Sequence, residues 1–222
     1  VFSKNIEFKN ILFKNPNSKK IVLDIKNLKI KSGIFLGITG QTGSGKTTFV
    51  DLLLGLLEPI SGEILVDNIS LKKYLIKSWQ SKVAYVPQFS FMADDTIKNN
   101  IALGKTESEI DFEKIKKSSE AAFLSNFIEK DLQFKYDTII GEDGVRLSGG
   151  QRQRISIARA LYDDKSIIVF DEATNSLDSV TENLIIENLL KNKENKTIIM
   201  ITHRLSSLQK CDEILFLENG SA

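Results

Sequence analysis

Two glycine-rich loops in this sequence have the residue types that bind phosphate. Residues 40–47 read GQTGSGKT, and residues 147–151 read LSGGQ. In each loop small residues open a helix, so backbone N–H groups and the positive end of the helix dipole can face an anion. One nucleotide does not need both loops. We therefore expect two copies to pair head to tail, with each nucleotide between the first loop of one copy and the second loop of the other.

The first loop also carries residues for a cation. Glycine backbone can wrap the β- and γ-phosphates of a nucleotide, the Lys46 ammonium neutralises them, and the Thr47 hydroxyl reaches a magnesium ion. Thr48 would continue the helix and touch the α-phosphate. A plain helix-initiating turn is the alternative. The predicted binding residues are Gly40, Gln41, Thr42, Gly43, Ser44, Gly45, Lys46, Thr47 and Thr48.

The elements that position these loops follow from alternating patterns. Short β-branched runs, at residues 34–39, 83–86, 166–170 and 196–202, alternate with helical patterns, and polar residues suited to chemistry follow each run. This alternation predicts a mainly parallel sheet flanked by helices, with ligands at the carboxyl ends of the strands. A further strand is expected from Asn5 to Phe13.

A helical region is predicted between the first loop and the strand at 166–170. From Thr96 to about Thr138 the strand signals vanish, and apolar residues recur with helical spacing. Ser148 is then expected to cap a helix that runs to about Tyr162. The apolar residues with this spacing are Phe112, Ile115, Ala122, Phe123 and Phe127, and the arginines expected on the polar flanks of the second helix are Arg152, Arg154 and Arg159.

The LSGGQ segment, placed shortly before the run Ile167–Glu172, resembles the signature and Walker B motifs of ATP-binding-cassette (ABC) ATPases, and residues 40–47 resemble their Walker A motif. The resemblance spans nearly the whole chain. It implies an α/β fold, with a P-loop NTPase core around a mainly parallel sheet, an antiparallel β subdomain, and a helical subdomain that carries the signature. Residues 1–222 would form a single ABC ATPase domain, with the helical subdomain at about 96–160 inserted in the core.

The resemblance gives roles to polar residues after the strands. Asp171 ends an apolar strand, where an ionised carboxylate is costly unless it meets a cation, so it is the expected magnesium ligand together with Thr47 and Gln88. Glu172 matches the glutamate that polarises the attacking water. Gln88 matches the Q-loop glutamine, and His203, the one histidine of the chain, matches the switch histidine that contacts the γ-phosphate.

The second loop has an implied role at the nucleotide of a partner copy. Residues 176–178 resemble the D-loop, which in the family runs along the dimer interface, although Asp178 could equally be a helix N-cap. The residues predicted to bind nucleotide in this way are Ser148, Gly149, Gly150, Gln151 and Asp178.

One position departs from the family. Residues 6–16 read like its opening strand and turn, but Asn15 stands where an aromatic residue usually stacks on adenine. Stacking of a base on an aromatic ring is worth about 1 to 3 kcal/mol, so we expect weaker nucleotide binding or poorer discrimination between bases. Phe13, on the same strand face, is either a substitute or a core aromatic.

Composition limits the classes of partner. Among 222 residues, 30 Lys and Arg balance 29 Asp and Glu, and a net charge of +1 offers no field for nucleic acid, which we do not expect as a partner. The single cysteine, Cys211, excludes an internal disulfide and suits a reducing compartment. No apolar run approaches the roughly 18 residues that span a bilayer, so the isolated domain is expected to be soluble.

The surrounding protein is predicted from the same resemblance. Residues 137–144 resemble the X-loop of exporter-type cassettes. Residues 51–59, together with residues 201–205, are weakly similar to exporters of lipid-linked oligosaccharides or polysaccharides. We expect a piece of a longer polypeptide, with a transmembrane domain fused N-terminally, at the cytoplasmic face of the cell (inner) membrane. The second cassette would make a homodimer or a pseudo-dimer, ATP and Mg²⁺ would be bound, and transport would be outward. The alternatives are a non-transport ABC ATPase and a nucleotide-regulated binding module with little turnover.

Overall fold

The computed structural model describes residues 2–16, 18, 20–71, 75–193 and 196–222, which form two compact units. The first unit comprises Val1–Tyr85, Lys165–Asp171 and Lys193–Ala222. The second comprises Val86–Asp164 and Glu172–Asn192. Each unit therefore brings together segments that lie far apart in the sequence.

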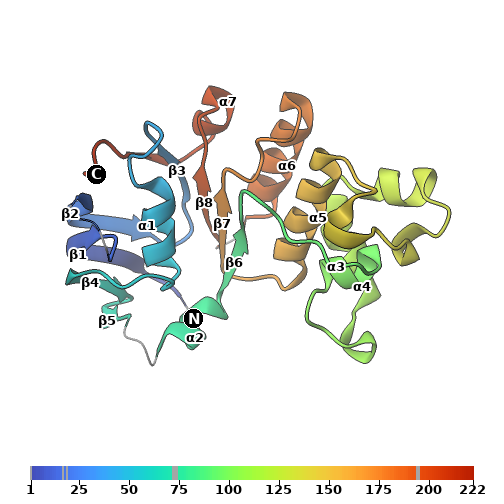
Figure 1. Ribbon diagram of the computed structural model, residues 1–222, viewed down its shortest axis with the longest axis horizontal. Coiled ribbons are helices and arrows are strands. Elements are labelled where there is room, and N and C mark those ends of the chain that lie inside the picture. The colour runs from blue at the N-terminus through green and yellow to red at the C-terminus, as the bar shows by residue number, and fades with distance from the viewer. Residues whose placement is uncertain (1, 17, 19, 72–74, 194–195) are drawn as a thin grey trace. The chain divides into compact units, whose positions relative to one another are not determined.

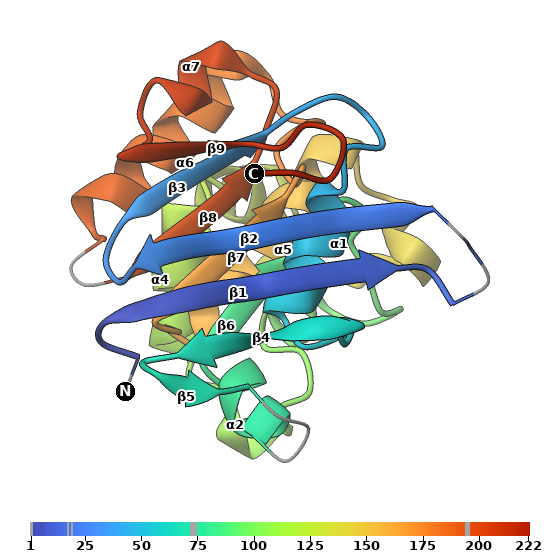
Figure 2. The same cartoon turned by 90° about the vertical axis from the view of Figure 1, so that its left-hand side faces the viewer.

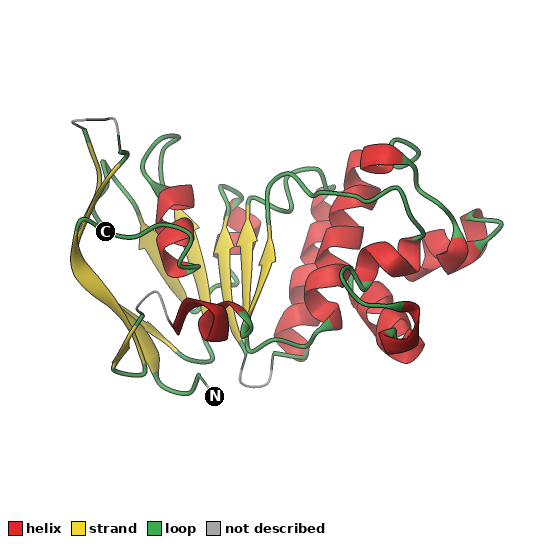
Figure 3. Cartoon of the chain, turned by 60° about the horizontal axis from the view of Figure 1, so that its bottom comes forward, coloured by secondary structure: helices red, strands yellow, loops and turns green. Residues whose placement is uncertain are grey.

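A five-stranded sheet forms the centre of the first unit. Its strand order is β6-β7-β8-β3-β9, and the pairs β7–β8, β8–β3 and β3–β9 are parallel. Every residue of β7 and β8 is buried, as expected for strands covered on both faces. The strands predicted at residues 34–39, 83–86, 166–170 and 196–202 are confirmed, and Figure 3 shows them side by side. Their bounds are β3 (Phe35–Thr39), β6 (Val83–Val86), β7 (Ile167–Asp171), β8 (Thr197–Ile201) and β9 (Glu213–Phe216).

A second sheet in the same unit is antiparallel and has the order β2-β1-β4-β5 (Figure 2). It confirms the predicted antiparallel subdomain, and β1 covers the strand expected from Asn5 to Phe13. In β2 the apolar residues Leu23, Ile25 and Ile30 are buried and the lysines are exposed, as expected for an antiparallel sheet with one solvated face. The strands are β1 (Asn5–Lys14), β2 (Ile21–Lys31), β4 (Ser61–Val66) and β5 (Ile69–Ser70).

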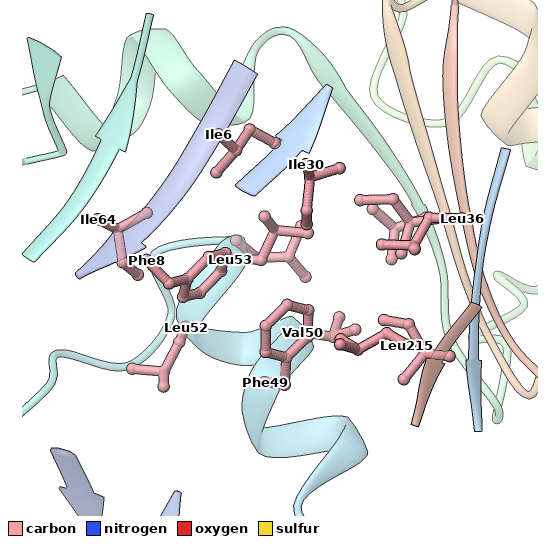
Figure 4. Packing of buried hydrophobic residues seen from close by; sticks show 14 of the residues in the cluster. Ile6, Phe8, Ile30, Leu36, Phe49, Val50, Leu52, Leu53, Ile64 and Leu215 are labelled. Carbon is pink, nitrogen blue, oxygen red and sulfur yellow. The ribbon is translucent and has the colours of Figure 1, made fainter. Parts of the chain in front are cut away.

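Helix α1 (Lys46–Leu53) lies between the two sheets (Figure 1). Its apolar side chains join a core contributed by both sheets, and Phe49 stacks on Phe8 of β1 with ring centroids 4.7 Å apart (Figure 4). Helix α2 (Ile76–Gln80) closes the far end of α1, since Trp79 Nε1 donates a hydrogen bond of 2.7 Å to the carbonyl oxygen of Leu53. The helix that follows the first glycine-rich loop is thus fixed along its length. A short helix, α7 (Leu205–Leu208), follows β8.

The second unit is built mainly from helices, which Figure 3 shows in red. Their buried face includes Ile101, Ile115, Ile155 and Ile186. The predicted cap and length of the second helix are confirmed, because α5 starts after Ser148 and ends at Tyr162. The helices are α3 (Ile97–Ile101), α4 (Phe112–Ala121), α5 (Gly149–Tyr162), α6 (Ser179–Lys191), three 3₁₀ turns at Glu107–Glu109, Lys135–Asp137 and Glu142–Gly144, and a π-helical turn at Phe127–Asp131.

One detail of the helical prediction is wrong. Helix α4 ends at Ala121, and Phe123, with a φ of 54° and 37% of its surface exposed, does not continue the apolar face. Spacing alone missed this, because it does not report where the backbone enters a left-handed conformation.

Arg159, one of the arginines expected on the polar flanks of α5, is half-buried. Its guanidinium donates to the carbonyl oxygens of Asn100 (2.7 Å) and Phe91 (3.0 Å), and burial lowers its pKa.

Candidate functional site

The loop between β3 and α1 is shaped by glycine and closed by a lysine. Gly45 has a φ of 100°, and a Cβ there would lie 2.8 Å from Leu23 Cδ2, so only glycine fits without a shift. Lys46 is 6% exposed, and its Nζ donates to the carbonyl oxygens of Gly40 (2.8 Å) and Gln41 (2.9 Å). The ammonium is therefore held inside the loop by the loop's own backbone.

The same loop has the donors that a phosphate group needs. No side chain in the described part of the chain caps α1, so its first N–H groups keep their capacity to bind an anion. The hydroxyl of Ser44 is buried, and among the described residues it has no hydrogen-bond partner. A buried orphan hydroxyl next to uncapped N–H groups and a buried ammonium fits a bound phosphate.

Other predicted residues of the first unit lie at the carboxyl ends of neighbouring parallel strands. The loop at 40–47 follows β3, Asp171 ends β7, and His203, which is exposed, lies two residues beyond β8. Asp171 is 4% exposed and accepts a hydrogen bond of 3.2 Å from the Tyr85 hydroxyl. Burial, and then the charge of Asp171, raise the pKa of Tyr85. The Thr47 hydroxyl and the Asp171 carboxylate are the hard oxygen donors that magnesium prefers, so the donor set fits this ion.

The structure places Glu172 with Gln88 in the second unit. Gln88 Nε2 donates to Glu172 Oε2 over 3.3 Å, and Asn175 Nδ2 donates to the same oxygen over 3.0 Å. Glu172 has a φ of 51°, a left-handed conformation that is uncommon outside glycine and that concentrates at functional sites. Sequence reasoning missed Asn175, because a polar residue in a loop carries no periodic signal. Its three-residue spacing from Glu172 was the available clue.

The signature residues form the first turn of α5. Ser148 Oγ accepts from Gln151 N (3.2 Å), and Gln151 Oε1 accepts from Ser148 N (2.8 Å), which makes a capping box. Gly149 and Gly150 lie between these two residues, and a Cβ on Gly150 would come within 3.2 Å of the Ser176 carbonyl oxygen. Small residues are thus required where the loop 172–178 passes close to the helix.

The D-loop residues share a pocket with the signature. Gln153, 5% exposed, accepts from Ser176 N over 2.9 Å and joins α5 to this loop. Asp178 caps α6 by accepting from Val180 N and Thr181 N, and these hydrogen bonds lower its pKa. The pocket has a volume of about 450 Å³, and its lining consists of Ser148, Gly149, Gly150, Arg154, Ser176, Leu177, Asp178 and Thr181. The N-cap alternative for Asp178 is therefore correct, and it does not conflict with a place in this pocket.

Phe13 is a core residue. Its side chain is 4% exposed and belongs to the cluster between the two sheets, whereas Asn15 is exposed just after β1. A ring packed in this way has no free face for a base. Of the two readings of Phe13, the structure supports the core aromatic.

Comparison with known proteins decides the family. The profile of the ABC transporter family matches residues 23–175, which is more than half of the chain. The chain belongs to the ABC transporter family. Membership agrees with the predicted resemblance and fold class, and it implies an ATP-binding domain. No helix within the described residues is both long and apolar enough to cross a membrane.

Individual relatives of this ABC chain are exporters or flippases by name. It is 41% identical to the ATP-dependent lipid A-core flippase of Escherichia coli (strain K12) over 216 residues, which is 97% of this chain and 37% of the relative. The flippase of the same name from Salmonella paratyphi A is 42% identical over equal shares. A solved structure of a bacterial Atm1-family ABC exporter with ATP bound superposes with a TM-score of 0.92 at 33% identity, covering 100% of this chain and 38% of that one. The chain thus spans little more than a third of the proteins that it matches.

Proposed function

We propose that this ABC domain binds ATP with Mg²⁺ and hydrolyses the ATP to ADP and phosphate. The observation that carries the proposal is the buried Lys46 ammonium inside a loop whose N–H groups and Ser44 hydroxyl remain able to bind an anion. The name of the solved relative with ATP bound supports the choice of nucleotide. Residues 1–222 would act as a single ATPase domain, with the helical subdomain at about 96–160 as an insertion.

Each part of the site then has a task. Residues 40–48 hold the phosphates, and Lys46 exchanges its loop carbonyl partners for phosphate oxygens. Thr47, Asp171 and Gln88 would hold the magnesium ion, which supplies charge neutralisation on the phosphates. Glu172 orients and polarises the attacking water, a contribution typically worth about 100- to 10,000-fold in rate. His203 would contact the γ-phosphate.

The second glycine loop supports a shared site. Ser148, Gly149, Gly150, Gln151 and Asp178 would bind the ATP held by the first loop of another copy, in a head-to-tail homodimer or pseudo-dimer. The pocket of about 450 Å³ that the signature shares with the D-loop has small residues and polar groups that can bind phosphate oxygens, together with the cationic Arg154. ATP would therefore hold two cassettes together, and hydrolysis would release them.

The domain would drive export across a membrane. The relatives are about 2.6 times as long as this chain, which supports a transmembrane domain in the same polypeptide, fused N-terminally, with the cassette at the cytoplasmic face of the inner membrane. The name of the flippase relatives supports a lipid or a lipid-linked sugar as cargo and outward movement. The test is a flippase assay on the complete polypeptide. If neither a lipid nor a lipid-linked sugar moves across the membrane, the proposed cargo is wrong.

The decisive experiment mixes two inactive variants of the complete polypeptide, Lys46→Ala and Ser148→Arg. A shared site predicts recovered ATPase activity in the mixture, because one of the two composite sites in a mixed dimer is intact. The control mixes Ser148→Arg with Lys114→Ala, a substitution on the exposed face of α4 that leaves both glycine-rich loops intact. This mixture shows the activity that a partner with wild-type loops restores. Folded variants that form mixed dimers without recovery would contradict the shared site. A wild-type protein that binds ATP without turnover would instead be a nucleotide-regulated module.

A further inference from the structure

The segment after Glu172 closes into a turn. Asn175 N donates to the carbonyl oxygen of Glu172 over 3.2 Å, and Glu172 itself takes a φ of 51°. A non-glycine residue in this conformation is held there by its surroundings. The short turn therefore fixes the direction in which the Glu172 side chain leaves the backbone.

The side chain of Asn175 also reaches the carboxylate. Its Nδ2 lies 3.0 Å from Glu172 Oε2, inside the range of a well-formed hydrogen bond, whereas Gln88 Nε2 lies 3.3 Å from the same oxygen. Asn175 is thus held to Glu172 both by its backbone and by its amide. Gln88 comes from a separate segment of the chain.

We propose that Asn175 is a positioning residue for Glu172, a role that rests on the proposed ATPase function. In this role Asn175 acts through Glu172: its amide holds Glu172 Oε2 and would fix the carboxylate for the attacking water. Gln88 reaches the same oxygen over the longer distance of 3.3 Å, and in the proposed site its amide is also a ligand of the magnesium ion. Asn175 is tied to Glu172 a second time, by the backbone hydrogen bond that closes the four-residue turn 172–175.

A purely structural reading of Asn175 makes a different prediction. If its amide only stabilises the turn, then Asn175→Asp, which keeps the shape of the side chain, should be milder than Asn175→Ala. If its N–H group holds the Glu172 carboxylate, Asn175→Asp places a second carboxylate beside the first and should be the more damaging of the two. Asn175→Ser keeps a shorter donor in the same turn and should recover part of the activity.

The test measures steady-state ATP hydrolysis by the complete polypeptide with these three substitutions. We expect kcat to fall about tenfold in Asn175→Ala, the loss typical of one hydrogen bond to a charged group, with KM and the affinity for ATP unchanged. Asn175→Asp should fall further and Asn175→Ser less. The matched control is Asn126→Ala, an exposed asparagine of the same unit, which should match the wild type.

Two reference proteins separate the possible failures. A wild type without hydrolysis, or a Glu172→Gln variant with full hydrolysis, would overturn the proposed function and this role with it. A normal wild type and an inactive Glu172→Gln variant, combined with wild-type kcat in Asn175→Ala, would overturn the role of Asn175 alone. So would an Asn175→Asp variant that is more active than Asn175→Ala, or a loss that appears in KM and thermal stability rather than in kcat.

Discussion

The Walker A loop and the signature loop both place glycine at the start of a helix, but they prepare the backbone differently. In the first, α1 begins at a left-handed glycine, no side chain in the described residues caps it, and an ammonium is buried in the loop. In the second, Ser148 and Gln151 already satisfy each other's N–H groups. The first loop can therefore attract an anion by itself, whereas the second has fewer donors left and is suited to completing a site that another loop has begun.

The largest effect is expected at the ammonium. Lys46→Ala removes the only charge buried in the first loop and makes that loop resemble the second. Hydrolysis should fall about 1,000-fold, a loss in the range seen when a group that donates to the transition state is removed. ATP affinity should fall as well. Both are measured by phosphate release and by calorimetric titration with ATP. Lys114→Ala serves as the control, and full ATP affinity in Lys46→Ala would contradict the contrast between the loops.

Ser148→Arg should separate binding from turnover. A bulky side chain at the start of α5 blocks the approach of a second nucleotide-bearing loop, so we expect hydrolysis to fall about 100-fold. The affinity of a single copy for ATP should be unchanged, because the first loop is untouched. Ser108→Arg, on an exposed 3₁₀ turn, is the matched control. A parallel loss of affinity in Ser148→Arg monomers would mean that the second loop binds nucleotide independently.

Replacing one glycine of each loop by alanine should show that only the first loop needs glycine for its backbone conformation. Gly45→Ala forces a Cβ into a left-handed conformation against Leu23, which should cost about 2 kcal/mol and lower the melting temperature by about 4 to 8 °C. Among the described residues, the added Cβ of Gly149→Ala meets the Ser176 side chain alone, with Cβ at 3.5 Å and Oγ at 3.7 Å. These are ordinary contacts, so stability should be unchanged or slightly higher. Calorimetric melting of both variants checks this, and equal destabilisation would refute the distinction.

The smallest change is expected at the base. Phe13 is packed in the core and leaves no ring face for the base, whereas residue 15 is exposed. Asn15→Tyr adds an aromatic ring there, and stacking on the adenine should tighten ATP binding by about tenfold. Asn27→Tyr, at an exposed position on β2, is the control. Isothermal titration with ATP measures the difference, and an unchanged affinity would show that residue 15 does not lie at the adenine.

Much of the fold could be predicted because local signals and tertiary structure agree. The strands of the parallel sheet are apolar runs, and α5 has a serine cap, a glutamine three residues later and a clear end. Helix α4 shows where this agreement stops. Its apolar spacing continued past Ala121, but the chain enters a left-handed residue at Phe123. Periodicity reports which residues prefer burial and does not report where the backbone turns.

The candidate site also has a part that could be predicted from the sequence and a part that could not. Residue types and spacing were enough to select Lys46, Asp171, Glu172 and Ser148, whose roles stay predictions. Contacts made by side chains in loops were not accessible, because nothing in the order of residues says that Asn175 reaches the Glu172 carboxylate or that Gln153 reaches the backbone of Ser176. These contacts depend on how two backbone segments meet.

The indole hydrogen bond at the end of α1 has a practical consequence. Trp79 is the only tryptophan of the chain, its ring is 4% exposed, and Phe2 packs edge-on against it at 6.1 Å. Its emission therefore originates from one site, at the Leu53 carbonyl group on which the helix following the Walker A loop ends. Native fluorescence, without any label, would report in real time on strain that reaches this end of the helix during a catalytic cycle.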